Sequence, residues 1–302
     1  MLLTHINLVN NGRFIGECLR LTERDRIVIP VPLFHCFGCV IGTMSAAVTG
    51  AASVSPSPTF DARATLEAIV QERATAVYGV PAMFIAELQY PEFAQFDLSS
   101  LRTGVMAGAP CPIEVMKRVV GDMHCPELVV AYGQTESSPV ITMSRADDSV
   151  ETRCTTVGGA LPETEVRIAS TATGETLPVG EQGELLARGY MVMKGYDGEP
   201  EATRTAVDEG RLAAHRRPGG DARRRLFPYH LLRAGHDYPG RAGEEEIREY
   251  CRARLAHFKV PQHVRFVDVF PMTLSGKVQK FKIRQQEVGE RGLERAKARE
   301  TA

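Results

Sequence analysis

The feature that most constrains the fold is a repeated order of apolar strand, short turn and helix between residues 26 and 143. Short apolar runs at 26–31, 75–78, 101–107 and 127–133 predict buried strands. Small-residue, capping and proline signals predict helices at Gly42–Gly50, from Asp61, after Pro81 and from Pro112. This alternation predicts an α/β domain with a mostly parallel sheet, in which ligands bind at the carboxyl ends of the strands.

The pattern changes after residue 157. Runs at 165–170, 183–189 and 190–196 alternate apolar and polar residues between tight-turn signals, which predicts an antiparallel meander. Residues 210–241 show no periodicity and are rich in arginine. An amphipathic helix is expected at 244–258, a strand at 264–270, and a glycine-containing loop leading into a basic helix at 271–286. These last elements predict a small α+β domain.

Charge and hydropathy exclude several classes of protein. The formal net charge of the 302 residues is -1, so no global field attracts nucleic acid or an acidic membrane. No apolar run approaches the length of a membrane span, although peripheral membrane contact stays open. Residues 1–13 are polar and lack a signal-peptide core. We therefore expect a cytoplasmic protein.

The seven cysteines form an odd, scattered set, which does not predict a disulfide framework. Cys36 and Cys39 have C-x-x-C spacing, but a metal or redox site needs a second ligand pair or a redox fold context. Neither is present in the sequence. We expect two small apolar side chains in a buried turn.

Two polar segments are candidates for chemistry. The stretch AYGQTE, residues 131–136, follows a predicted strand and offers backbone amides, the Thr135 hydroxyl and the Glu136 carboxylate. Such a group suits a nucleotide phosphate with its Mg²⁺, although polar turns are also common without function. In PMTLSGKVQK, Lys277 could bring a charge to a phosphate or carboxylate, or could be an ordinary solvated lysine.

Taken together and in order, these segments resemble the adenylate-forming (AMP-binding) superfamily, specifically fatty acyl-CoA synthetases. The resemblance is borne by THINLVNNG, PVPLFHCFG, YGVPAMF, AGAPCP, AYGQTE, VGGALP, GELLARGYMVMKGY with PEAT, RLAHFKVP and PMTLSGKVQKFKIR. It implies an incomplete large adenylate-forming domain at 1–207 and a remnant of the C-terminal domain at 244–302. Residues 208–243 lie between them as an aberrant linker.

The resemblance also implies a reaction and its residues. ATP and a fatty acid would give an acyl-adenylate and pyrophosphate, and the CoA thiol would then displace AMP. Lys277 would bridge the carboxylate and the α-phosphate, Thr135 would bind phosphate, and Glu136 would hold Mg²⁺. His35 and Val80 would line the acyl pocket together with Gly133. The adenylate site would comprise Gly108, Ala109, Pro110, Ala131, Tyr132, Gly133, Gln134 and Thr135.

Two parts of the family pattern are expected to be missing. The phosphate loop that precedes THINLVNNG in the family has no counterpart before residue 4. A Trp-Leu-His-Thr-Gly-Asp-Leu motif that grips the ribose is also absent. One choice of codons for Leu212 to Gly219 gives this motif when read one nucleotide later, and similar shifts work at two further places. The hypothesis is a frameshift near Gly210, with the frame regained near Ala242 and a block lost between.

Three readings follow. The first is an ATP-dependent acyl-CoA ligase whose activity the missing parts would impair. The second is a non-catalytic remnant that binds acyl or adenylate ligands weakly. A nucleic-acid binder using the arginine-rich stretch is the third, but no recognised binding module or interleaved aromatics support it. Three assays distinguish these readings. Release of pyrophosphate tests the first, an ATP-dependent shift in the melting temperature tests the second, and salt-dependent binding to DNA tests the third.

Overall fold

The structure, a computed structural model, describes residues 1–170, 172–178, 181–207 and 213–219, together with Arg252 and Lys282. The chain divides into two units, residues 1–230 and 231–302. Almost everything described lies in the first unit. The predicted helix at 244–258, the strand at 264–270 and Lys277 lie outside the described residues, and the predicted domain boundaries stay predictions.

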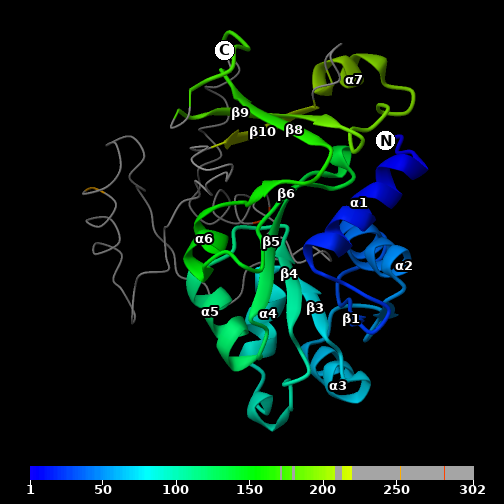
Figure 1. The fold of residues 1–302 in the computed structure, drawn as a ribbon, viewed down its shortest axis with the longest axis vertical. Coiled ribbons are helices and arrows are strands. Elements are labelled where there is room, and N and C mark those ends of the chain that lie inside the picture. The colour runs from blue at the N-terminus through cyan, green and yellow to red at the C-terminus, as the bar shows by residue number, and fades with distance from the viewer. Residues whose placement is uncertain (171, 179–180, 208–212, 220–251, 253–281, 283–302) are drawn as a thin grey trace. The chain divides into compact units, whose positions relative to one another are not determined.

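The described part of the first unit contains a mixed sheet in the order β2-β1-β3-β4-β5-β6-β7 (Figure 1). Strands β2, β1, β3, β4 and β5 are parallel, and β6 and β7 continue the sheet antiparallel. The strands are β1 (Arg26–Val28), β2 (Ala52–Val54), β3 (Ala76–Gly79), β4 (Thr103–Ala107), β5 (Glu127–Gly133), β6 (Val140–Met143) and β7 (Gly159–Ala160). The four strands predicted between residues 26 and 133 are confirmed.

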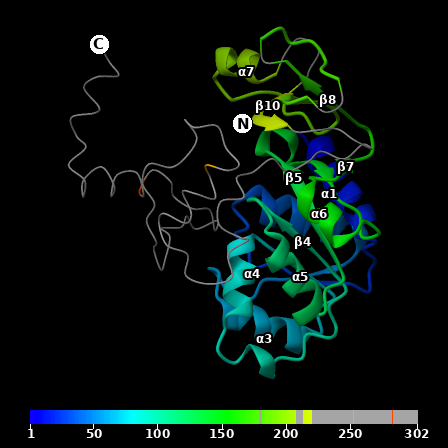
Figure 2. The same ribbon diagram turned by 90° about the vertical axis from the view of Figure 1, so that its left-hand side faces the viewer.

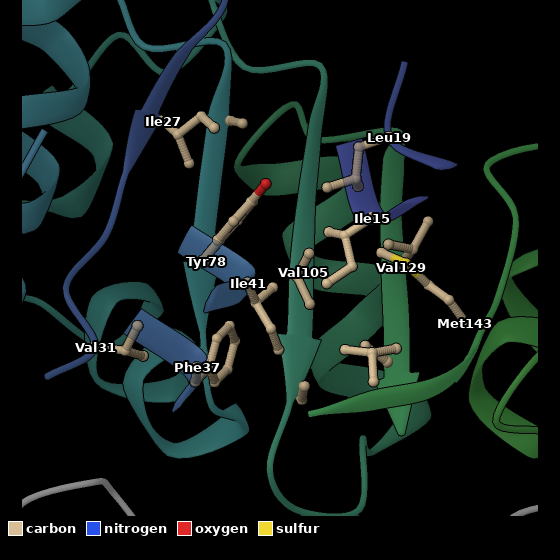
Figure 3. Packing of buried hydrophobic residues seen from close by; sticks show 14 of the residues in the cluster. Ile15, Leu19, Ile27, Val31, Phe37, Ile41, Tyr78, Val105, Val129 and Met143 are labelled. Carbon is tan, nitrogen blue, oxygen red and sulfur yellow. The ribbon is translucent and has the colours of Figure 1, made fainter. Parts of the chain in front are cut away.

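Both faces of this sheet are buried, because successive residues of a strand point to opposite sides. In β5, Val129 packs in one hydrophobic cluster and Val130 in the other. Figure 3 shows the first cluster, in which Ile15 of α1 (His5–Cys18) and Leu19, just after the helix, approach the sheet near Val129. Helices α3 (Ala62–Glu72), α4 (Pro81–Leu88) and α5 (Ile113–Asp122) cover the other face (Figure 2).

Helices follow the strands where the sequence predicted them, with one difference in where a helix begins. The helix expected at Gly42–Gly50 begins earlier, as a π-helix η1 (Phe37–Met44) that continues into α2 (Ser45–Thr49). It ends at Gly50, whose φ of 77° is a conformation that glycine adopts without strain. The remaining short helices are η2 (Phe93–Gln95), η3 (Thr135–Ser137), α6 (Val150–Thr155) and α7 (Pro200–Ala206).

The expected buried turn at Cys36 and Cys39 is wrong. Cys36 caps η1, Cys39 lies in its first turn, and Cys39 is exposed. The turn prediction failed because the Gly38 between the cysteines enters the helix. A Cβ on Gly38 would lie 2.4 Å from the Pro32 carbonyl oxygen, so the glycine permits close packing rather than a turn.

A second, antiparallel sheet has the order β10-β9-β8, with β8 at Thr164–Ala169, β9 at Gly183–Gly189 and β10 at Ala213–Gly219. The first two strands of the predicted meander are confirmed. Within the stretch that the sequence analysis interpreted as an aberrant linker, residues 213–219 form a strand. These residues pair with β9 as an edge strand, with a register shift between His215 and Pro218. Edge pairing needs only one side of the backbone, so it tolerates Pro218.

The third predicted strand, at 190–196, is not a strand. Met191, Val192 and Met193 are all buried, so the side chains do not alternate between a core and solvent. The backbone of this segment bonds to side chains and to the N-terminal residues instead of to a neighbouring strand. Its one bridge joins Gly195 to Leu2, whose N–H donates to the Gly195 carbonyl at 2.7 Å.

Candidate functional site

The candidate site lies where three neighbouring parallel strands end. Gly79 of β3 pairs with Met106 of β4, and Ala107 of β4 pairs with Ala131 of β5. Because parallel strands end at the same edge, the residues after them lie along that edge. Val80 follows β3, residues 108–110 follow β4, and Tyr132 and Gly133 end β5 just before Gln134 and Thr135. The sequence analysis therefore grouped residues that the sheet does bring to one edge.

The turn after β5 is fixed by its own hydrogen bonds. Thr135, Glu136 and Ser137 form the 3₁₀ turn η3, and the Ser137 N–H donates to the Gln134 carbonyl at 2.9 Å. The buried Ser137 hydroxyl also donates to this carbonyl at 2.8 Å. Gly133 is needed here, since a Cβ on it would lie 2.0 Å from the Pro139 carbonyl oxygen. The turn thus presents Thr135 and Glu136, both half-buried, in a defined conformation.

The segment 190–196 supports this turn from the side. The Ser138 hydroxyl donates to the Met191 carbonyl at 2.6 Å, and the Met193 N–H donates to the Glu136 carbonyl at 2.9 Å. A third bond reaches the functional group itself, because the Tyr196 hydroxyl lies 2.8 Å from Glu136 Oε1. Main chain and carboxylate of Glu136 are therefore both held by one segment.

The loop before η1 approaches the same turn. Cys36 Sγ lies 3.4 Å from Thr135 Oγ1 and 3.8 Å from His35 Nδ1. The Phe37 N–H lies 3.1 Å from His35 Nδ1, a geometry that makes Nδ1 the acceptor and leaves the proton on Nε2. His35 is thus placed near Thr135 through Cys36. Val80 is buried at the start of α4.

A cluster of charged residues lies at the opposite ends of the strands and is structural. Arg102, just before β4, bonds Asp25 Oδ2 at 3.0 Å and Glu127 Oε2 at 3.0 Å. Burial alone would raise the pKa of Asp25, but hydrogen bonds from Arg102, Thr75 and Thr22 hold it below its ordinary value. These groups tie together the beginnings of the strands, away from the candidate site.

The donors among the described residues suit a divalent cation that is bound together with a nucleotide. They contain no group of three or more His, Cys, Asp or Glu side chains that could form a protein cage for a metal. Mg²⁺ is commonly held by one or two carboxylates together with substrate phosphates, keeping its waters. Glu136, with Thr135 beside it, supplies the carboxylate and hydroxyl of such a site. The donor set therefore suits Mg²⁺ bound with a nucleotide rather than by protein alone.

Sequence reasoning missed the residues that hold the site together. Asn11 in α1 is fully buried; its Nδ2 donates to the Val140 carbonyl at 2.9 Å and its Oδ1 accepts from the Val140 N–H at 3.2 Å. Asn7 donates to the carbonyls of Tyr190 and Val192. The available signal was Thr4, which caps α1 in a reciprocal pair of bonds with Asn7.

No helix in the described residues is long and apolar enough to cross a membrane.

Comparisons with known proteins show the family to which the chain belongs. The family model described as AMP-binding enzyme matches residues 1–197, and the AMP-binding enzyme C-terminal domain matches 228–277. "Putative acyl-CoA synthetase YngI" of Bacillus subtilis (strain 168) is 40% identical, covering 95% of this chain and 61% of that protein. The human "Medium-chain acyl-CoA ligase ACSF2, mitochondrial" is 36% identical, covering 94% of this chain and 54% of that protein. The chain thus spans just over half the length of these relatives.

Solved structures show the same fold. ATP-bound MatB from Rhodopseudomonas palustris has a TM-score of 0.79 at 23% identity, covering 94% of this chain and 64% of that one. The anthranilate CoA ligase AuaEII in complex with anthranoyl-AMP has a TM-score of 0.79 at 22% identity, covering 93% and 63%. The expected α/β fold, a mostly parallel sheet with a second, antiparallel one, is confirmed. On its family-model match over 1–197, this chain belongs to the AMP-binding enzymes, the adenylate-forming superfamily.

Proposed function

We propose that this chain bears the ATP-dependent activation of a fatty acid and its transfer to CoA. The carboxylate of the acid attacks the α-phosphorus of ATP, pyrophosphate leaves, and an acyl-adenylate forms. The CoA thiol then attacks the acyl carbon and AMP leaves. The names of the relatives support this reaction class, and the names of the ACSF2 proteins make a medium-chain acid the first substrate to test.

The observation that supports the proposal most directly is the arrangement of the turn at 134–138. Thr135 offers a hydroxyl to a phosphate oxygen, and Glu136 offers a half-buried carboxylate whose position is set by Tyr196. Gly108, Ala109 and Pro110 lie along the neighbouring strand end and would contact the adenine, with Ala131, Tyr132, Gly133 and Gln134 beside it. A magnesium ion held by Glu136 would offset the negative charge of the phosphates.

The acyl and lysine sides of the site complete the proposal. Val80 and His35 would line the alkyl chain, with Gly133 close by. Lys277 would bring its ammonium group to the carboxylate and α-phosphate, where negative charge builds during attack. Lys277 lies outside the described residues, so its role rests on the match of the C-terminal family model over 228–277. A cytoplasmic location is likewise proposed, although the ACSF2 name places that relative in mitochondria.

The test is fatty acid-dependent release of pyrophosphate and AMP by the full chain, over saturated acids from short to long. Glu136→Gln and Lys277→Ala are each expected to lower turnover about 100-fold, the usual cost of losing one charge-stabilising group. Glu23→Gln and Lys280→Ala serve as matched controls, one an exposed carboxylate and the other a lysine three residues from Lys277. Turnover unaffected by both site variants, or no acid-dependent turnover at all, contradicts the proposal.

The rate itself tests the predicted impairment. The match to the Bacillus protein extends over 337 residues, whereas this chain has 302, so that protein has at least 35 residues there without a counterpart. This shortfall supports the hypothesis of a lost block. We expect turnover well below that of full-length YngI measured in parallel, and an equal rate contradicts the impairment. Sequencing of the encoding DNA tests the frameshift.

A further inference from the structure

We propose that Tyr196 is a positioning residue for the divalent cation: its hydroxyl holds one oxygen of Glu136 and leaves the other for the cation. This inference rests on the proposed function, since it assumes that Glu136 binds the cation. It assigns a role to a residue outside the candidate catalytic set. Tyr196 follows β9 by seven residues and reaches a turn sixty residues earlier in the chain.

The first step is the direction of the bond. An ionised carboxylate only accepts hydrogen bonds, so the Tyr196 hydroxyl donates to Glu136 Oε1 across 2.8 Å. A bond to a charged acceptor is about twice as strong as a neutral one. Because Oε1 accepts from Tyr196, the Glu136 side chain is held in one conformation. Oε2 then keeps its lone pairs for a cation.

The second step is the rigidity of the donor. The Tyr196 N–H donates to Thr203 Oγ1 at 2.9 Å, and the Lys194 N–H donates to the Leu2 carbonyl at 2.9 Å. Gly195 has a φ of 153°, and a Cβ there would lie 2.7 Å from Thr203 Cγ2. Only glycine fits this close approach, which sets Tyr196 against α7.

The third step is that one segment fixes both the backbone and the carboxylate of Glu136. The Met193 N–H donates to the Glu136 carbonyl, three residues before Tyr196 donates to the side chain. Such support of a metal-binding carboxylate by a hydrogen-bond donor is the general way in which proteins orient ligands, and its loss costs about 10–100-fold in metal affinity.

The test measures ATP binding to the full chain by calorimetry, once with Mg²⁺ and once with EDTA. The ratio of the ATP affinity with Mg²⁺ to that with EDTA measures how much the cation contributes to binding. Tyr196→Phe is expected to lower this ratio about tenfold while leaving ATP affinity in EDTA unchanged. Tyr190→Phe is the matched control: it removes a hydroxyl from the same segment that lies 3.2 Å from Asn11 Nδ2 and does not contact Glu136. It should change stability without changing the ratio.

A double-mutant cycle separates positioning from general destabilisation. If Tyr196 acts through Glu136, adding Tyr196→Phe to Glu136→Gln or to the shorter Glu136→Asp produces no further loss in the ratio. An additive loss, or an unchanged ratio in Tyr196→Phe when Glu136→Gln abolishes the cation effect, overturns this inference alone. No Mg²⁺-dependent ATP binding by the unaltered chain overturns the cation role of Glu136 and the inference with it.

Discussion

The most sharply testable consequence of the packing concerns Glu87, in the last turn of α4. Its side chain is fully buried, and neither carboxyl oxygen has a hydrogen-bond partner. Burial raises the pKa of Glu87 from 4.5 to about 8, and no charged neighbour contributes to the shift. On α5, which packs against α4, Arg118 pairs with Asp122 at 2.9 Å and its guanidinium also donates to the Leu88 carbonyl at 3.5 Å. Glu87 is therefore protonated in the folded protein at neutral pH.

The sign of the effect on stability follows from proton counts. Between about pH 4.5 and pH 8 the folded state holds a proton on Glu87 that the unfolded state has lost, so stability falls as pH rises. The 2.5 units between 4.5 and pH 7 correspond to a cost of about 3 kcal/mol at neutral pH. Glu87→Met, which keeps the unbranched shape, removes this cost and the unpaired oxygens.

The assay is urea unfolding of the two proteins across this pH range. The stability gained by Glu87→Met should grow by roughly 2 to 3 kcal/mol from about pH 5 to about pH 7. Glu92→Met, the same change at an exposed position near the end of α4, should show no such growth. A gain that is constant across the range means that water or a partner reaches the Glu87 carboxyl, and the reasoning from burial is then wrong.

Two further predictions concern the supports of the fold. Asn11→Ala leaves the buried N–H and carbonyl of Val140 without these partners and should cost about 3 kcal/mol in urea unfolding; a loss below about 1 kcal/mol contradicts the role of Asn11. Asp25→Asn should cost about 2 kcal/mol at neutral pH, a figure reduced because Arg102 is one-third exposed. Because the pKa of Asp25 is lowered in the folded state, this stabilisation is present above its ordinary value of 3.8 and is lost as pH falls further. The difference in the free energy of unfolding between the unaltered protein and Asp25→Asn should therefore become smaller in acid. A difference that stays constant with pH contradicts the role of the Asp25 carboxylate.

The sheet and the edge that bears the site could be predicted from sequence because they depend on local signals. An apolar run such as 127–133 followed by a polar turn specifies both the strand and its functional end. Helix starts were equally readable at Asp61, whose side chain accepts from the Ala64 N–H, and at Pro81. These features need only the few residues around them.

The supports of the site could not be predicted because they depend on contacts between distant segments. Asn7 and Asn11 were part of a stretch described only as polar, but inside the fold each side chain donates to a distant backbone carbonyl. Residues 190–196 were predicted to be a strand, yet their backbone bonds to residues 2, 7, 136 and 138. Periodicity reports which side chains are apolar, and it does not report where the backbone hydrogen bonds go.

The residues that hold the turn with Thr135 and Glu136 lie in a different part of the chain from Lys277, so ATP binding and turnover are expected to depend on different regions. The turn with Thr135 and Glu136, and the segment that holds it, lie between residues 2 and 196, within the continuous family match over 1–197. Lys277 lies beyond residues 198–227, which neither family model matches. A lost or altered sequence between the two matched regions can therefore displace Lys277 without changing the turn that contains Thr135 and Glu136. Cation-dependent ATP binding should then survive where acyl transfer does not, so binding with little turnover indicates a defect between the domains, whereas loss of both indicates a defect within residues 1–197.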